Sequence, residues 1–129
     1  MSKQELSDEY LSNLTEIFVL VHQKTLDKTL RWETTVDDDI FQASLRNYTI
    51  LLHSFQNSFI HDRPFLEIID GNGNIIETIT PIFLSGMIDD FERKIFELNY
   101  WSKRTALDID KSLIEVLKEL KGEIDGGTF

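Results

Sequence analysis

The clearest structural signal in the sequence runs from Phe65 to Ile79 and reads FLEIIDGNGNIIETI. Two apolar-rich segments, 65–70 and 75–79, flank the tetrapeptide Gly71-Asn72-Gly73-Asn74. Glycine and asparagine tolerate the positive φ angles of tight turns, so this pattern predicts a β-hairpin. We therefore expect an antiparallel sheet in the middle of the chain.

Upstream of this hairpin the hydrophobic pattern also has a period of two. Strands are predicted over residues 30–33, 40–45 and 48–55, and Arg46-Asn47 is short enough to be a two-residue hairpin connection. Tyr48, Ile50 and Leu52 are expected on the sheet face that the helices cover. The polar stretch 56–63 is predicted to be a loop.

Helical patterns lie on both sides of these strands. Residues 3–29 repeat apolar side chains at three- and four-residue steps, and Ser2 with Glu5 forms a capping-box pattern. Thr80-Pro81 is a helix-start signal, and a last helix is predicted to end at Gly122. The inward stripe of this last helix is expected to comprise Ile109, Leu113, Val116 or Leu117, and Leu120.

The order of these elements predicts an α+β fold. Consecutive strands with short connections favour an antiparallel meander of about five strands, with one N-terminal and two C-terminal helices packed mainly on one face. A chain of 129 residues, 41% of them hydrophobic, is expected to form one hydrophobic core. We expect a single domain over residues 1–122 and a frayed tail over 123–129.

Composition and charge limit the classes of function that this chain can have. The chain has no cysteine and no apolar run of signal-peptide length, which favours a cytoplasmic protein. Its net charge is −10, and residues 32–79 hold eight acidic against two basic side chains. Such a surface repels phosphate groups, so neither nucleic acid nor membrane is an expected partner.

No motif for catalysis or for a metal stands out. His22, His53 and His61 lie in separate segments and lack metal-ligand spacing, so structural roles are favoured. The acidic run 37–39 is interpreted as a turn rather than a cation site. The sequence after Asp70 fails as a calcium loop, because Ile75 stands where that loop needs glycine. We expect no catalytic residue, metal or cofactor.

One feature suggests a function. If Ile50 and Leu52 face the helices, the opposite sheet face gathers large apolar side chains, where polar ones would be expected on a solvated face. The predicted interface residues are Leu51, Phe55, Phe65, Ile69 and Ile79, with Ile75 beside them. Either a terminal helix or the 56–63 loop covers this face, or it binds a protein partner or a second copy of the chain.

The leading hypothesis is therefore a non-catalytic protein–protein interaction module, homodimeric through this face. One alternative is an acidic inhibitor or immunity-type protein that its charge steers onto a basic partner. Another is a small-molecule sensor or enzyme with a pocket between sheet and helices. That pocket would be lined by Trp32, Tyr48, His53 and Trp101.

Several core and turn positions resemble a loose group of small uncharacterised bacterial α+β proteins across residues 14–120. The resemblance is carried by Leu30-Arg31-Trp32-Glu33, Phe41-Gln42-Ala43-Ser44-Leu45, Tyr48-Thr49-Ile50, Leu66-Glu67-Ile68-Ile69-Asp70 with Gly73, Arg104-Thr105-Ala106-Leu107 and Asp110-Lys111-Ser112-Leu113. It implies a bacterial origin and a compact module of sheet and helices. The group brings no activity and no functional residue.

Overall fold

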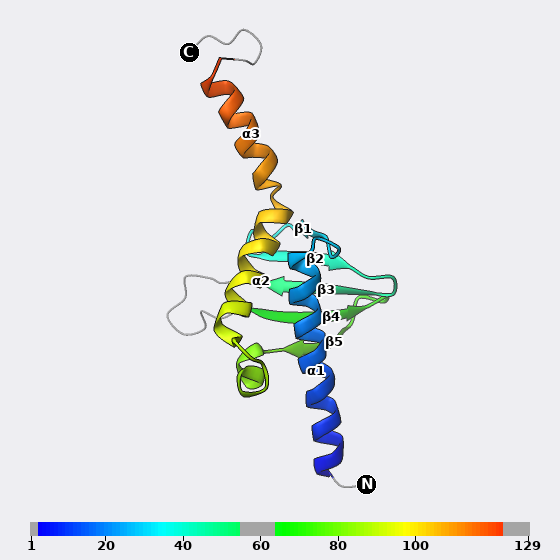
Figure 1. The fold of residues 1–129 in the computed structure, drawn as a ribbon. Helices are drawn as coiled ribbons and strands as arrows, with labels where there is room; N and C mark the ends of the chain where they lie inside the picture. Colours follow the sequence, from blue (N-terminus) through cyan, green and yellow to red (C-terminus); the bar gives the residue numbers. More distant parts are fainter. Residues whose placement is uncertain (1–2, 55–63, 123–129) are drawn as a thin grey trace.

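The structure, a computed structural model, describes residues 3–54 and 64–122. Its elements follow the order helix α1, five strands β1 to β5, a 3₁₀ helix η1, and helices α2 and α3 (Figure 1). Their bounds are α1 Lys3–Leu26, β1 Trp32–Thr34, β2 Ile40–Ser44, β3 Tyr48–His53, β4 Phe65–Asp70, β5 Ile75–Ile79, η1 Pro81–Met87, α2 Phe91–Ala106 and α3 Ile109–Leu120. The predicted α+β class is confirmed.

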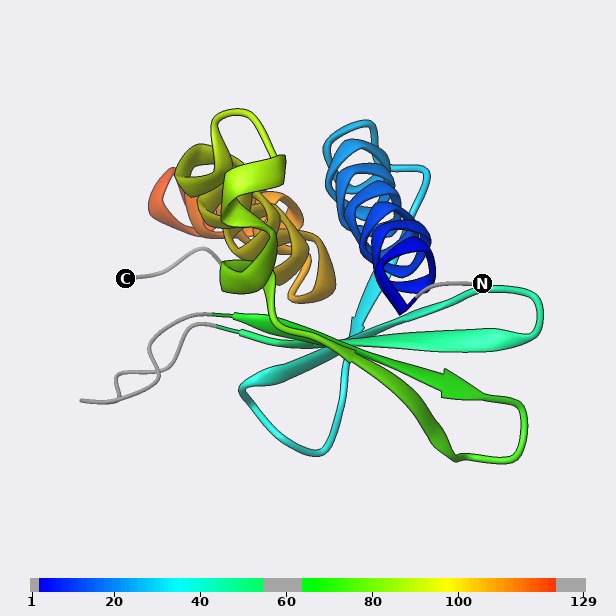
Figure 2. The same ribbon diagram turned by 90° about the horizontal axis from the view of Figure 1, so that it is seen from below.

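The five strands form one antiparallel sheet in the order β1-β2-β3-β4-β5, which is a meander. Helices α1 and α2 and η1 lie on one face of this sheet, and no helix of the described residues lies on the other (Figure 2). Below, the covered face is called the inner face and the opposite one the outer face. The edges of the sheet are β1 and β5.

The core lies between the inner face and the two long helices. Phe18 from α1 and Phe91 from α2 meet there with ring centroids 6.1 Å apart. Alternate strand residues such as Phe41, Leu52 and Leu66 point toward them and are at most 1% exposed. This period of two is what an antiparallel sheet with one covered face requires.

A polar contact joins α1 to the first strand inside this core. The indole Nε1 of Trp32 donates a hydrogen bond of 2.9 Å to the hydroxyl of Thr25. That hydroxyl donates in turn to the carbonyl of Val21, at 2.7 Å. Both Trp32 and Thr25 are buried, so each polar group finds its partner without water.

The hairpin predicted over residues 65–79 has the expected bounds and a tight turn. Gly73 has a φ of 87°, a conformation that favours glycine. The Asp70 carboxylate accepts hydrogen bonds from the backbone N–H groups of Asn72 and Asn74, both at 2.9 Å. These bonds, that from Asn74 first, lower the pKa of Asp70.

The register of this hairpin changes by one residue at a β-bulge. Ile68 stands opposite Glu77, whereas Ile69 stands opposite Ile75, so Ile76 is an extra residue in β5. Because of this extra residue, Glu77 and Ile79 face inward although Ile75 faces outward. Glu77 accordingly reaches the helix layer, where the hydroxyl of Tyr10 in α1 donates a hydrogen bond of 2.7 Å to its carboxylate.

The helix predicted to start at Thr80-Pro81 is divided in two. Residues Pro81–Met87 form η1, and α2 begins only at Phe91, after Asp90 with a φ of 57°. Gly86 and two consecutive aspartates, 89 and 90, disfavour a continuous α-helix across this stretch. The predicted stripe is nevertheless buried, from Leu84 and Ile88 to Leu98.

Helix α3 differs most from its prediction. It follows α2 after a bend at Asp108, whose φ is 52°, and extends past the β1 edge of the sheet (Figure 1). Gly122, with a φ of 71°, follows its end as predicted. None of its residues is buried, so the prediction that its apolar stripe faces inward is wrong. The predicted tail, 123–129, lies outside the described residues.

Candidate functional site

Three of the five predicted interface residues lie on the outer face: Leu51, Phe65 and Ile69. Leu51 alternates with buried Ile50 and Leu52, so its side chain points away from the helices. All three are partly buried by their neighbours in the sheet, although no described helix covers them (Figure 2).

The other two predicted interface residues are Ile79 and Phe55. Ile79 is 1% exposed and pairs with Leu66 in the core, so its assignment to the outer face is wrong. The cause is the bulge, because the extra residue turns Ile79 inward while Ile75 keeps its place beside Ile69. Ile75 is 56% exposed. Phe55 lies outside the described residues.

A histidine–carboxylate pair also lies on the outer face. His53 Nε2 is 2.5 Å from Glu67 Oε1, on the neighbouring strand. The His53 ring stacks on Phe65, with centroids 4.2 Å apart and planes inclined by 8°. The two polar side chains are only 19% and 16% exposed. This pair links β3 to β4. By the register of the sheet, polar Gln42 and Thr78 share the outer-face row of Leu51 and Glu67.

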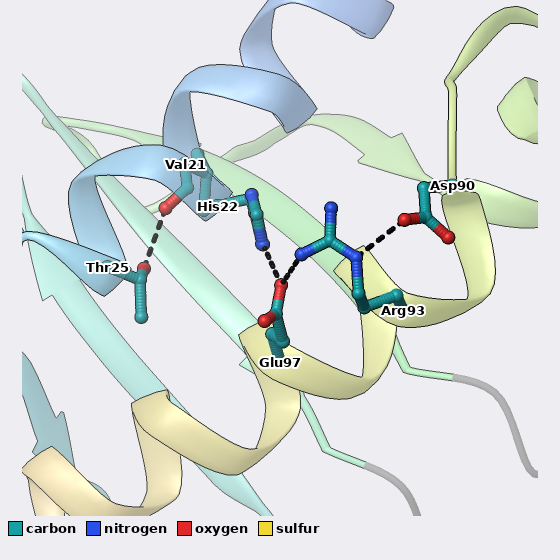
Figure 3. A network of polar contacts seen from close by, with 6 residues as sticks. All are labelled: Val21, His22, Thr25, Asp90, Arg93 and Glu97. Atoms are coloured by element: carbon teal, nitrogen blue, oxygen red, sulfur yellow. Dashed lines mark hydrogen bonds and ion pairs between the residues drawn. The ribbon is translucent and has the colours of Figure 1, made fainter.

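The second histidine, His22, joins the two long helices (Figure 3). It is 6% exposed on α1, and its Nε2 lies 2.9 Å from Glu97 Oε1 on α2. Arg93 donates to the same Oε1 at 2.9 Å and to Asp90 at 2.6 Å. The hydrogen bond from His22, and then the charge of Arg93, lower the pKa of Glu97. The polar groups of these four side chains thus contact one another, and the contact between His22 and Glu97 joins α1 to α2.

The predicted pocket between sheet and helices is present only in part. A groove of about 480 Å³ lies between β1 and the bend from α2 to α3, and both Trp32 and Trp101 line it. Tyr48 and His53 are not among its lining residues. Tyr48 was predicted beside Ile50 on the inner face, but its side chain is 44% exposed.

Arg104 is one of the polar residues that line this groove. Its guanidinium makes hydrogen bonds of 3.0 and 2.7 Å to Asp110, and one of 3.1 Å to the hydroxyl of Tyr100. It also lies 5.8 Å from the centre of the Trp101 ring. The bond to Asp110 raises the pKa of Arg104 above its usual value. These contacts fix the bend between α2 and α3.

The acidic segments have structural roles in the turns. Asp37 accepts a hydrogen bond of 2.9 Å from the backbone N–H of Asp39, as an aspartate does in a turn. In the described ranges, no three His, Cys, Asp or Glu side chains lie close enough together to hold a metal ion. Nor does any helix within those ranges have the length and apolar character needed to cross a membrane.

The exposed surface that the sequence pattern does not predict is the apolar stripe of α3. Its members are between 50% and 74% exposed: Leu113, Ile114, Val116, Leu117 and Leu120. The helical periodicity was visible in the sequence, but it carries no information about what covers the stripe. Only the placement of α3 beyond the sheet edge shows that the rest of the described chain leaves it uncovered (Figure 1).

The fold and these surfaces define a two-layer α+β protein with an exposed apolar stripe on α3 and an outer sheet face that no described helix covers. Comparison with protein-family models, with curated proteins and with solved structures finds no match. The resemblance to small bacterial α+β proteins therefore stays a prediction.

Proposed function

We propose that this chain is a non-catalytic protein–protein interaction module and that α3 is its main docking element. The observation that carries the proposal is the exposure of α3. Twelve residues form this helix, none is buried, and its apolar stripe is at least half exposed. Large apolar surfaces of this kind usually mark interaction sites.

The physical chemistry of a short helix supports the same conclusion. Isolated helices shorter than about 12–15 residues are marginal in water, and most helices in proteins are stabilised by the packing of one apolar face. Within the described chain that packing is missing for α3. A partner surface that covers Leu113, Leu117 and Leu120 would supply it.

The outer face is the second docking surface of the proposed module. It combines Leu51, Phe65 and Ile69 with a histidine–glutamate pair whose polar groups contact each other. The two histidines that the structure describes both hydrogen-bond a glutamate within the fold, which suits structural roles.

The proposal is tested by sedimentation of the fluorescently labelled chain in an extract of cells that express it. We expect a complex that sediments faster than the free chain and that Leu117→Asp abolishes. Ser112→Asp is the matched control, because it adds the same charge to α3 outside the stripe. Circular dichroism and urea unfolding confirm that both variants fold. A labelled wild-type chain that sediments as a monomer, both purified and in the extract, would refute the proposal.

A further inference from the structure

Helix α3 has an exposed apolar stripe, and the outer face carries Leu51, Phe65 and Ile69 among polar side chains. The two surfaces lie on opposite sides of the same sheet. Helix α3 belongs to the helix layer, as both views of the molecule show (Figures 1 and 2). The outer face, with Leu51 and Ile69, points the other way. In this arrangement α3 cannot cover the outer face of its own chain.

A second copy can satisfy both surfaces at once. Because α3 extends past the β1 edge, a two-fold axis along that edge would place the second sheet beside the first (Figure 1). The rotation inverts the second copy, so its outer face lies on the side of the first copy's helix layer. We infer that two copies associate with their β1 edges side by side and that α3 of each copy packs on the outer face of the other.

The length of α3 agrees with this arrangement. Twelve residues of helix span about 18 Å, and neighbouring strands are about 4.8 Å apart. Counted from the β1 edge, α3 therefore crosses about four strands. Its far end, with Leu117 and Leu120, reaches β3 and β4, where Leu51 and Ile69 lie.

The size of the contact favours a reciprocal exchange over a pair of α3 helices. A stable interface buries roughly 800 Å² on each partner, and one contact along a helix of about 18 Å is smaller than that. In the two-fold arrangement each copy contributes both its α3 and its outer face, so the buried area doubles. Symmetric interfaces of this kind are common in homodimers.

Charge permits the copies to approach at α3. The whole chain carries −10, which opposes self-association. Residues 109–121 hold three acidic side chains and three lysines, so the segment is neutral. On the outer face, Glu67 is paired with His53, and Glu33 in β1 is the other acidic side chain that the register places there. The two surfaces therefore meet without strong repulsion.

Because the chain contains no cysteine, introduced thiols can test this arrangement. Leu117→Cys on one copy and Leu51→Cys on a size-tagged copy are mixed and treated with a short bis-maleimide. We expect a cross-link between the two variants, and sedimentation of the wild type as a dimer. Glu115→Cys is the matched control, since at 3.6 residues per turn its side chain lies on the opposite side of α3 from Leu117 and should cross-link much less. Thr49→Cys, on the same face as Leu51, replaces Leu51→Cys if that variant folds poorly.

The outcomes separate this inference from the proposed function on which it rests. Cross-linking of Leu117→Cys to itself, without a product with Leu51→Cys or Thr49→Cys, would show paired α3 helices and overturn the exchange. A monomeric wild type at high micromolar concentration would also overturn it. The interaction module would still stand if the labelled chain formed a Leu117-dependent complex in the cell extract.

Discussion

Two leucines in the C-terminal helices provide a direct test of the exposure of α3. Leu98 in α2 is fully buried, whereas Leu117 in α3 is 50% exposed. Truncation of a core leucine to alanine costs about 2–5 kcal/mol, because it removes buried methyl groups and leaves a cavity. Truncation at an exposed site usually changes the free energy of unfolding by less than about 0.5 kcal/mol.

We therefore expect Leu98→Ala and Leu117→Ala to differ by at least about 1.5 kcal/mol in the free energy of unfolding. In a chain of 129 residues, a change of 1 kcal/mol moves Tm by about 4 °C. Leu98→Ala should thus lower Tm by roughly 8–20 °C, and Leu117→Ala by roughly 2 °C or less.

The assay is urea unfolding of both variants at a concentration where sedimentation shows monomers. A cost above about 2 kcal/mol for Leu117→Ala under these conditions would refute the reasoning, because it would mean that α3 packs within its own chain. At higher concentration the dimer adds stability to the wild type, and Leu117→Ala should lose that increment.

Three further predictions concern contacts described above. Thr25→Val should cost about 1–3 kcal/mol in urea unfolding, because the buried Nε1–H of Trp32 loses its acceptor. Ile79→Asp should prevent stable folding, whereas Ile75→Asp should leave far-UV circular dichroism unchanged; equal effects would contradict the bulge. The pKa of Glu97 is lowered in the folded state, so its contribution to stability is present above its ordinary value of 4.5 and is lost as the pH falls through the lowered value. The stability advantage of wild type over Glu97→Gln should therefore shrink in acid, and an advantage that does not change with pH would disprove this account.

Local sequence signals predicted most of the sheet. The turn from Gly71 to Asn74 and the alternation on both sides of it give the observed bounds of β4 and β5. The face of Ile79 could not be predicted in this way, because a bulge depends on pairing across two strands and leaves no local pattern. The break between η1 and α2 was missed because the apolar spacing from Leu84 to Leu98 fits one continuous helix.

The candidate surfaces were predicted less completely, for a physical reason. Periodicity shows which side of an element is apolar, and this identified Leu51, Phe65 and Ile69. What covers an apolar side depends on where elements distant in sequence lie. Leu113 and Leu117 were therefore expected in the core, although the bend at Asp108 directs α3 past the edge of the sheet.

The bulge at Ile76 makes this position of β5 tolerant of both substitution and deletion. Many side chains could occupy this exposed position, since Ile76 is 52% exposed. Loss of the residue itself would restore regular pairing, because Ile75 and Glu77 already stand opposite the consecutive residues Ile69 and Ile68. Glu77 and Ile79 would therefore stay on the inner face. A sequence that shares this fold can therefore lack one residue at position 76 and keep the same sheet edge, whereas a single deletion elsewhere in β5 would shift the inward-facing residues.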